Sequence, residues 1–249
     1  AGLVPLLLSS AVATVISRSL IGNSPFFQAF NLPWAPGNVP YVFLCGVFCA
    51  LVGIFVIRGT YRIGGLLHEH FTHPWSRLLV GGSALCVILM VFPSLRGTGY
   101  ASVGQLLVGD VSGLTAPNPL FGWLPASTVL PVLIVTASIF VKAVASALTI
   151  ESGGDGGIFA PTLFIGAFAG FAFARLLNMT GMTSLSESNF AVIGMCGVFT
   201  AVMRAPLTGI FLVAEVTGGY ILLVPLMLVS AAAWVAAHCF EPQSIYRKG

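Results

Sequence analysis

The chain has 249 residues, of which 57% are hydrophobic and only 7% are charged, and its mean hydropathy is +1.01. A water-soluble domain does not bury so large an apolar share, so the composition indicates an integral membrane protein. The formal net charge is +3, and the basic residues form no dense patch of the kind that binds nucleic acid. No nucleic acid partner is therefore expected. The five cysteines are scattered through apolar segments, which disfavours a disulfide framework.

Several apolar runs reach the ~20 residues that an α-helix needs to cross a bilayer. The alternation typical of a membrane β-barrel is missing, so the expected fold is all-α. In chain order, the expected helices cover residues 3–20, 42–57, 78–92, 129–150, 162–177, 190–202, 207–216 and 221–240. A short connection is expected from Arg58 to Arg77, and its positive charges predict that it is cytoplasmic.

Some of these segments are too short to cross the membrane alone. Residues 190–202 and 207–216 are separated by a break at Arg204-Ala205-Pro206. Residues 93–125 are mixed and broken, which is typical of a re-entrant or partial helix followed by a loop. Such helices occur in channels and transporters whose binding sites lie near the membrane midplane. The sequence therefore predicts a multi-helix bundle with half-length and broken helices.

The most polar stretch, ESGGDGGIFAP (residues 151–161), separates two long apolar runs. Its residues 152–157, the glycine stretch, contain four glycines that permit positive φ at several positions. A helix that starts near Ile158 has unpaired amides at its positive end, so the amides of Ile158 and Phe159 are candidates for binding a small anion. The alternative is a simple turn between helices, with Pro161 in a first helical turn where proline is common.

Two long motifs carry a family resemblance. They are SGGDGGIFAPTLFIGAFAG (residues 152–170) and GMCGVFTAVMRAPLTGIFLVAEVTGGY (residues 194–220). Both resemble the second half of the CLC family of chloride channels and proton-coupled chloride transporters. The resemblance extends over nearly the whole chain, which would cover helices I to R in the family's lettering. It implies the second inverted repeat of the family fold plus the end of the first.

The resemblance also implies a site. The amides of Ile158 and Phe159, beside Gly156 and Gly157, would bind chloride centrally, and the Tyr246 hydroxyl would donate from the cytoplasmic side. No cofactor or metal is expected. The chain would form one transmembrane domain (residues 1–249), the C-terminal portion of the transport domain, without a soluble regulatory domain. A homodimer in a lipid bilayer is implied, and the short loops favour a bacterial inner membrane.

Three alternatives remain open at this point. The nearest is a fluoride/proton antiporter of the same fold, because the early anion-binding element that would distinguish it is not in this chain. Another is a membrane-embedded structural subunit without transport. The third is an intramembrane enzyme, which needs a nucleophile and a base close together. No Ser/His or Asp/Asp pairing of that kind stands out in the sequence, so no enzyme activity is expected.

Three ionisable residues lie in apolar surroundings, where a charge is a functional candidate by default. Lys142 and Arg204 either raise the positive potential along an anion path or pair with carbonyls at a helix C-terminus. Glu215 is expected to be structural, held by a backbone or hydroxyl hydrogen bond near Thr217 and Gly218.

Other polar and small residues have structural interpretations. HEHFTH (residues 68–73) lacks the H-E-x-x-H spacing of a zinc site, which favours a solvated cytoplasmic turn. Asp155 is expected to cap the following helix by accepting an amide N–H. Gly166 and Gly170 are expected to permit close helix approach.

Overall fold

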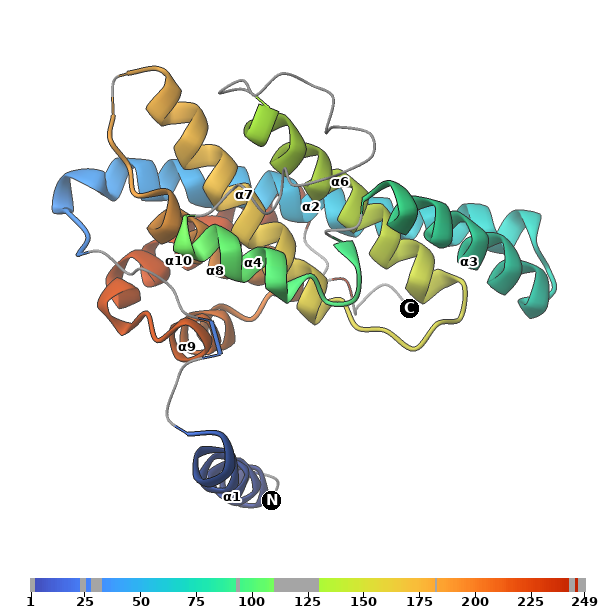
Figure 1. Ribbon diagram of the computed structural model, residues 1–249, viewed down its shortest axis with the longest axis horizontal. Helices are drawn as coiled ribbons and strands as arrows, with labels where there is room; N and C mark the ends of the chain where they lie inside the picture. Colours follow the sequence, from blue (N-terminus) through green and yellow to red (C-terminus); the bar gives the residue numbers. More distant parts are fainter. Residues whose placement is uncertain are drawn as a thin grey trace.

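The computed structural model describes residues 3–22, 26–27, 33–92, 95–109, 130–181, 183–241 and 245, and the regular structure in these residues is helical throughout (Figure 1). The helices are α1 (Leu3–Ile21), α2 (Val39–His70), α3 (Pro74–Val91), α4 (Tyr100–Val108), α6 (Leu130–Glu151), α7 (Phe159–Met179), α8 (Glu187–Met203), α9 (Pro206–Thr217) and α10 (Leu223–Phe240). Two 3-10 turns, Pro36–Asn38 and Tyr220–Leu222, precede α2 and α10.

The core is the crossing of α7 and α8, which are almost wholly buried. A side chain on Gly166 would place its Cβ only 2.5 Å from the Gly194 carbonyl oxygen, so the two backbones are in direct contact. This confirms the expected close approach at Gly166 and Gly170. The helices α2 and α10 pack on α8, while α6 packs on α2 and α7 (Figure 1). The start of α7 is therefore held by a rigid, close-packed body.

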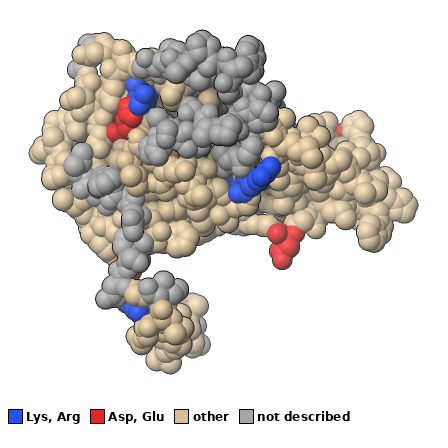
Figure 2. All heavy atoms as spheres, in the orientation of Figure 1, with Lys and Arg blue, Asp and Glu red and all other residues tan. Residues whose placement is uncertain are grey.

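Helix lengths largely follow the apolar runs. Five helical segments of the described chain, ending at His70, Val91, Glu151, Met179 and Phe240, are long and apolar enough to cross a membrane. The predicted short elements are also present, because α8 has 17 residues, α9 has 12 and α4 has 9. The break between α8 and α9 lies at Arg204, whose φ of 58° ends α8 before Pro206 begins α9. The space-filling view correspondingly shows few charged side chains on its face (Figure 2).

The connection predicted from Arg58 to Arg77 is wrong over most of its length, because α2 continues to His70. The buried residues Thr60, Gly64 and Leu67 recur at helical spacing, so the apolar face of α2 runs on past the arginines. Arg58 donates a hydrogen bond to Glu241 at 3.1 Å instead of ending the helix. With 32 residues, α2 is longer than the ~20 that span a bilayer, so tilting or projection beyond the apolar layer is required.

The first helix, α1, lies apart from the main body (Figure 1). The side chains of residues 4–20 are all exposed and mostly apolar. Its contacts with the body include an ion pair between Arg18 and Glu215 at 3.5 Å. Just after it, the Phe27 amide donates to the Val216 carbonyl at 2.9 Å. The apolar surface of α1 must therefore face lipid or other protein. The loop predicted within residues 112–125 lies outside the described residues.

Candidate functional site

The start of α7 lies where the sequence predicts it. The helix begins at Phe159, with Ile158 as the N-cap residue, and no side-chain hydrogen bond caps it. The first amides of a helix have no acceptor within the helix and lie at its positive end. Pro161 occupies the first turn and has no N–H, so the donors at this end are the amides of Ile158, Phe159 and Ala160. These amides can bind a small anion.

The glycine stretch uses the conformational freedom of glycine at one position. Of its four glycines only Gly153, with φ of +90°, has a left-handed backbone. One such residue is enough to end a helix, because the Gly153 and Gly154 amides then donate back to the carbonyls of Ile150 and Thr149. Gly154 is needed for another reason, since a Cβ there would lie 2.7 Å from the Thr149 carbonyl oxygen.

The last residues of the stretch leave the helix end open. A Cβ on Gly157 would meet the Phe159 amide nitrogen, at 3.9 Å, as its nearest heavy atom. Without that Cβ, the amide can be approached closely. The prediction that Asp155 caps α7 is wrong, because the side chain is exposed and α7 has no side-chain cap. The physical reason is position: Asp155 lies three residues before the N-cap, which is Ile158, whose side chain has no acceptor atom.

A cavity of about 380 Å³ borders this region. Its described polar lining comes from Thr98, from Lys142, Ser146 and Thr149 on α6, and from Asp155 with Gly156 and Gly157. The spacing of Lys142, Ser146 and Thr149 places them on one face of α6. This polar stripe was visible in the sequence but was not recognised there as a unit. Ala160 and Pro161 extend the cavity wall onto the first turn of α7.

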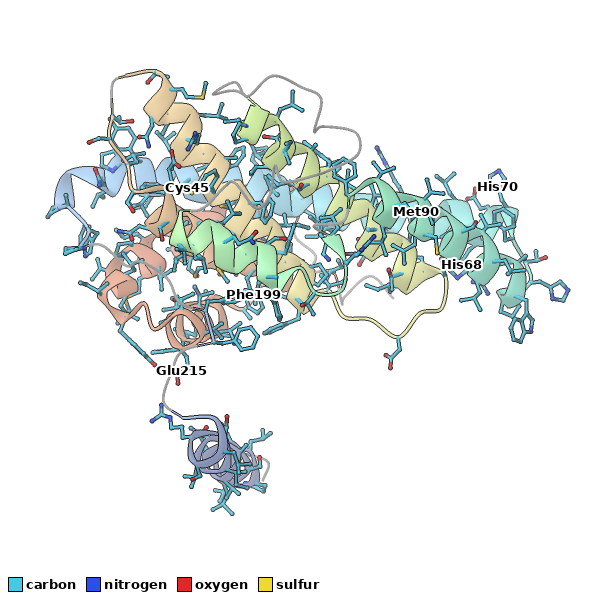
Figure 3. All side chains as sticks on the ribbon, viewed as in Figure 1. Cys45, His68, His70, Met90, Phe199 and Glu215 are labelled. Atoms are coloured by element: carbon cyan, nitrogen blue, oxygen red, sulfur yellow. The ribbon has the colours of Figure 1, made fainter. Side chains whose placement is uncertain are left out.

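Ile158 and Phe159 are not among the residues that line this cavity. Ile158 is half-buried and packs against the core. The Phe159 ring meets the Phe199 ring of α8 edge to face, with the ring centroids 5.2 Å apart. Phe199 is labelled in Figure 3. The structure therefore brings Gly156 and Gly157 to the cavity and fixes Phe159 beside it.

Lys142 is a buried cation in the wall of the cavity, with only 5% of its surface exposed. Its Nζ donates to the carbonyl oxygens of Leu95 at 3.1 Å and Gly97 at 2.9 Å and lies 5.2 Å from the centre of the Phe164 ring. Lys142 therefore pairs with carbonyls, as one of its two interpretations predicts. These carbonyls lie in the turn before α4 and not at a helix C-terminus. Within the described part of the chain, no carboxylate forms an ion pair with it, although the Asp155 carboxylate lines the same cavity.

The other charged candidates have structural partners. Arg204 donates to the carbonyls of Ala237 and Glu241 at the C-terminal end of α10, which confirms one of its two interpretations. Glu215 accepts a hydrogen bond from the Tyr220 hydroxyl, which confirms that a hydroxyl holds it. Glu215 lies on α9 facing α1, away from the start of α7 (Figure 3).

Tyr246 lies outside the described residues. The residue before it, Ile245, is buried, and its carbonyl accepts a hydrogen bond from the Tyr61 hydroxyl at 2.6 Å. The chain is therefore attached to α2 immediately before the predicted tyrosine.

The histidine group was predicted as a solvated turn, but two of its members belong to α2. His68 and His70 are exposed in the last turn of this helix, and each ring contacts the carbonyl of the residue four positions earlier. In the chain as far as it is described, no three His, Cys, Asp or Glu residues are grouped to hold a metal ion.

Comparison with known proteins gives a consistent set of relatives. The family model described as "Voltage gated chloride channel" matches residues 1–238. A putative chloride channel protein ClcB-like of Ralstonia nicotianae is 30% identical, with 98% of this chain and 53% of the relative covered. The H(+)/Cl(-) exchange transporter ClcA of Vibrio cholerae is 29% identical, with 96% and 48% covered.

A solved structure extends the comparison to the fold. The crystal structure of a CLC-type fluoride/proton antiporter superimposes with a TM-score of 0.76 at 21% identity. The alignment covers 98% of this chain and 55% of the antiporter. At this identity the likeness concerns the fold. The chain spans about half the length of each of these three proteins.

Proposed function

Because the chain belongs to the voltage-gated chloride channel family, also called CLC, we propose that it serves transport of chloride or a similar small anion across a membrane, and not catalysis. The observation that carries this proposal is the uncapped start of α7 at Ile158 and Phe159. The chain covers about half of its relatives' length, so the complete transport activity is part of the proposal.

The proposed central site binds the anion through the amides of Ile158 and Phe159. Gly157 keeps a side chain away from the Phe159 amide, which is the nearest heavy atom that a Cβ there would meet. Backbone amides carry partial charges, so they can hold an anion while still letting it leave, as conduction requires. The buried Lys142 adds a full positive charge in the wall of the neighbouring cavity, where its hydrogen bonds to carbonyls keep it in place.

The Tyr246 hydroxyl is proposed as a further donor to the same anion. Replacing Tyr246 with phenylalanine is expected to weaken chloride binding by about tenfold to a hundredfold, because a hydrogen bond to a charged group contributes about 1.5–3 kcal/mol. Isothermal titration calorimetry with chloride measures the change. Tyr220→Phe is the matched control, because its hydroxyl is occupied by Glu215 and its loss should leave chloride affinity unchanged. Equal affinity for Tyr246→Phe and the unmodified protein would rule out the hydroxyl as a ligand.

Flux from liposomes tests the proposed transport. Chloride efflux and external pH are recorded together, without an imposed proton gradient, and the assay is repeated with fluoride. Chloride movement with opposing proton movement indicates an exchanger, whereas chloride movement alone indicates a channel. Flux of fluoride in place of chloride would favour a fluoride antiporter. Folded protein that moves neither anion would contradict transport and leave a structural membrane subunit as the better interpretation.

A homodimer in a bacterial inner membrane is proposed as the assembly. The exposed apolar surface of α1 supports it, since such a surface needs lipid or protein to cover it. A monomeric mass by light scattering in detergent would contradict the dimer.

A further inference from the structure

Glu151 is the last residue of α6 and immediately precedes the glycine stretch. Its Oε2 atom lies 4.0 Å from Nδ1 of His68 on α2. The carboxylate rests directly against the α2 backbone, because a Cβ on Gly64 would be 2.6 Å from the same oxygen. Gly64 and His68 are four residues apart and share a face of α2. The contact therefore joins the end of α6 to the last turns of α2, where His68 is labelled (Figure 3).

The electrostatics of this contact depend on the imidazole. Glu151 lies at the C-terminus of a helix, where the helix dipole disfavours a negative charge. His68 Nδ1 is 2.8 Å from the Gly64 carbonyl oxygen, which can only accept, so Nδ1 carries a proton and Nε2 is free to gain a second one. Once Nε2 is protonated, His68 supplies the positive charge that Glu151 requires.

The neighbouring elements carry further titratable groups, which are Arg62, Glu69 and His70 on α2, His73 and Arg77 around the start of α3, and Asp155 after α6. The three on α2 lie one or two residues from Gly64 or His68 and so face other directions. Arg77 lies one turn before Gly81, which packs against Ser152. Among the described residues, His68 is the one whose basic side chain lies within 4.0 Å of the Glu151 carboxylate, and the contact is an ion pair when the imidazole is protonated.

Glu151 ends α6, and the glycine stretch begins directly after it. The amides of Ser152, Gly153 and Gly154 donate to carbonyls of the last turn of α6, and α7 starts five residues beyond Gly154. We propose that Glu151 and His68 form a proton-dependent tie that positions the glycine stretch, and with it the start of α7. The effect of this tie on the anion rests on the proposed function, whereas the tie itself does not.

The direction of the pH dependence follows from the charges. The tie requires a protonated His68 imidazole, so it is present at low pH and is lost as pH rises. Histidine is the side chain whose charge changes in the range from about pH 5 to about pH 8, which the test covers. Glu151 and His68 are both partly exposed, with side-chain exposures of 23% and 56%, so the expected effect is modest.

Hydrogen–deuterium exchange of the whole chain in detergent tests the tie without an anion. Protection of the Ser152, Gly153 and Gly154 amides, corrected for intrinsic exchange, should fall about threefold from about pH 5 to about pH 8. His68→Lys should keep the high protection throughout, because its charge is permanent over this range. His68→Gln and Glu151→Gln should show low protection throughout. His70→Gln is the matched control, since His70 contacts its own helix in the same way but has no carboxylate partner, and it should behave as the unmodified protein.

Protection that does not change with pH in the unmodified protein, or that changes equally in His68→Gln, would overturn the tie. Chloride titration of the same samples separates this result from the proposed function. Chloride binding with pH-independent protection contradicts the tie alone. A pH-dependent tie in folded protein that binds no chloride at any pH supports the tie and contradicts the anion site.

Discussion

Replacing Ile158 with proline is expected to weaken chloride binding by about tenfold to a hundredfold. Proline removes the amide N–H, and a hydrogen bond to a charged group is worth about 1.5–3 kcal/mol. The backbone can accept the change, because the φ of Ile158 is −77° and proline requires about −65°. The preceding residue is Gly157, which has no Cβ to collide with the proline ring. The Ile158 carbonyl still accepts from the Thr162 amide at 3.0 Å, so the first turn of α7 is kept.

Ile158→Ala is the matched control, because it removes the same packing but keeps the N–H. Its chloride affinity should stay within about threefold of that of the unmodified protein, because the amide N–H is kept. Titration calorimetry measures affinity, and gel filtration in detergent checks that both variants are folded. If both variants bind chloride equally well, the Ile158 amide is not a ligand.

Replacing Gly170 with alanine is expected to destabilise the protein by about 1–3 kcal/mol, the usual cost of overpacking a close-packed core. A Cβ at this position would lie 2.8 Å from the Phe190 carbonyl carbon and also overlap the Phe190 carbonyl oxygen. Both are backbone atoms, so α7 and α8 must separate. Because α7 carries the proposed site at its start and Gly170 lies in the middle of the same helix, anion affinity should fall together with stability.

Gly82→Ala is the control for this substitution. Gly82 lies within α3, and a Cβ there meets no heavy atom within 4 Å. Alanine should therefore stabilise that helix by up to ~1 kcal/mol through its higher helix propensity. Thermal unfolding in detergent compares the two variants, which should shift in opposite directions. A Gly170→Ala protein as stable as Gly82→Ala would show that the α7–α8 contact is not tight.

The sequence predicts the helices well where a run of apolar residues alone decides the structure. The starts and ends of α6, α7 and α10 fall close to the expected limits for this reason. The sequence does not predict the continuation of α2 past Arg58, because charged residues after an apolar run usually mark the end of a membrane helix. In the structure these residues are compatible with a helix whose opposite face, at Thr60, Gly64 and Leu67, remains buried.

The start of α7, which carries the proposed site, was predictable in its position, but its surroundings were not. Any glycine can adopt positive φ, so the sequence cannot show that only Gly153 needs it. Which glycine adopts positive φ depends on where α6 ends in the folded protein. The partners of Lys142 lie more than forty residues earlier in the chain, at Leu95 and Gly97, and only folding brings them together. Tyr246 remains a prediction from the family resemblance.

The most direct test of the anion site is anomalous diffraction from crystals of the protein soaked in bromide, which replaces chloride and can be located by its own scattering. A bromide peak is expected within hydrogen-bonding distance, about 3–3.5 Å for so large an anion, of the Ile158 and Phe159 amide nitrogens. In crystals of Ile158→Pro the peak should need a bromide concentration about tenfold to a hundredfold higher to reach the same occupancy. A well-ordered start of α7 with no bromide at saturating concentration would contradict the central claim.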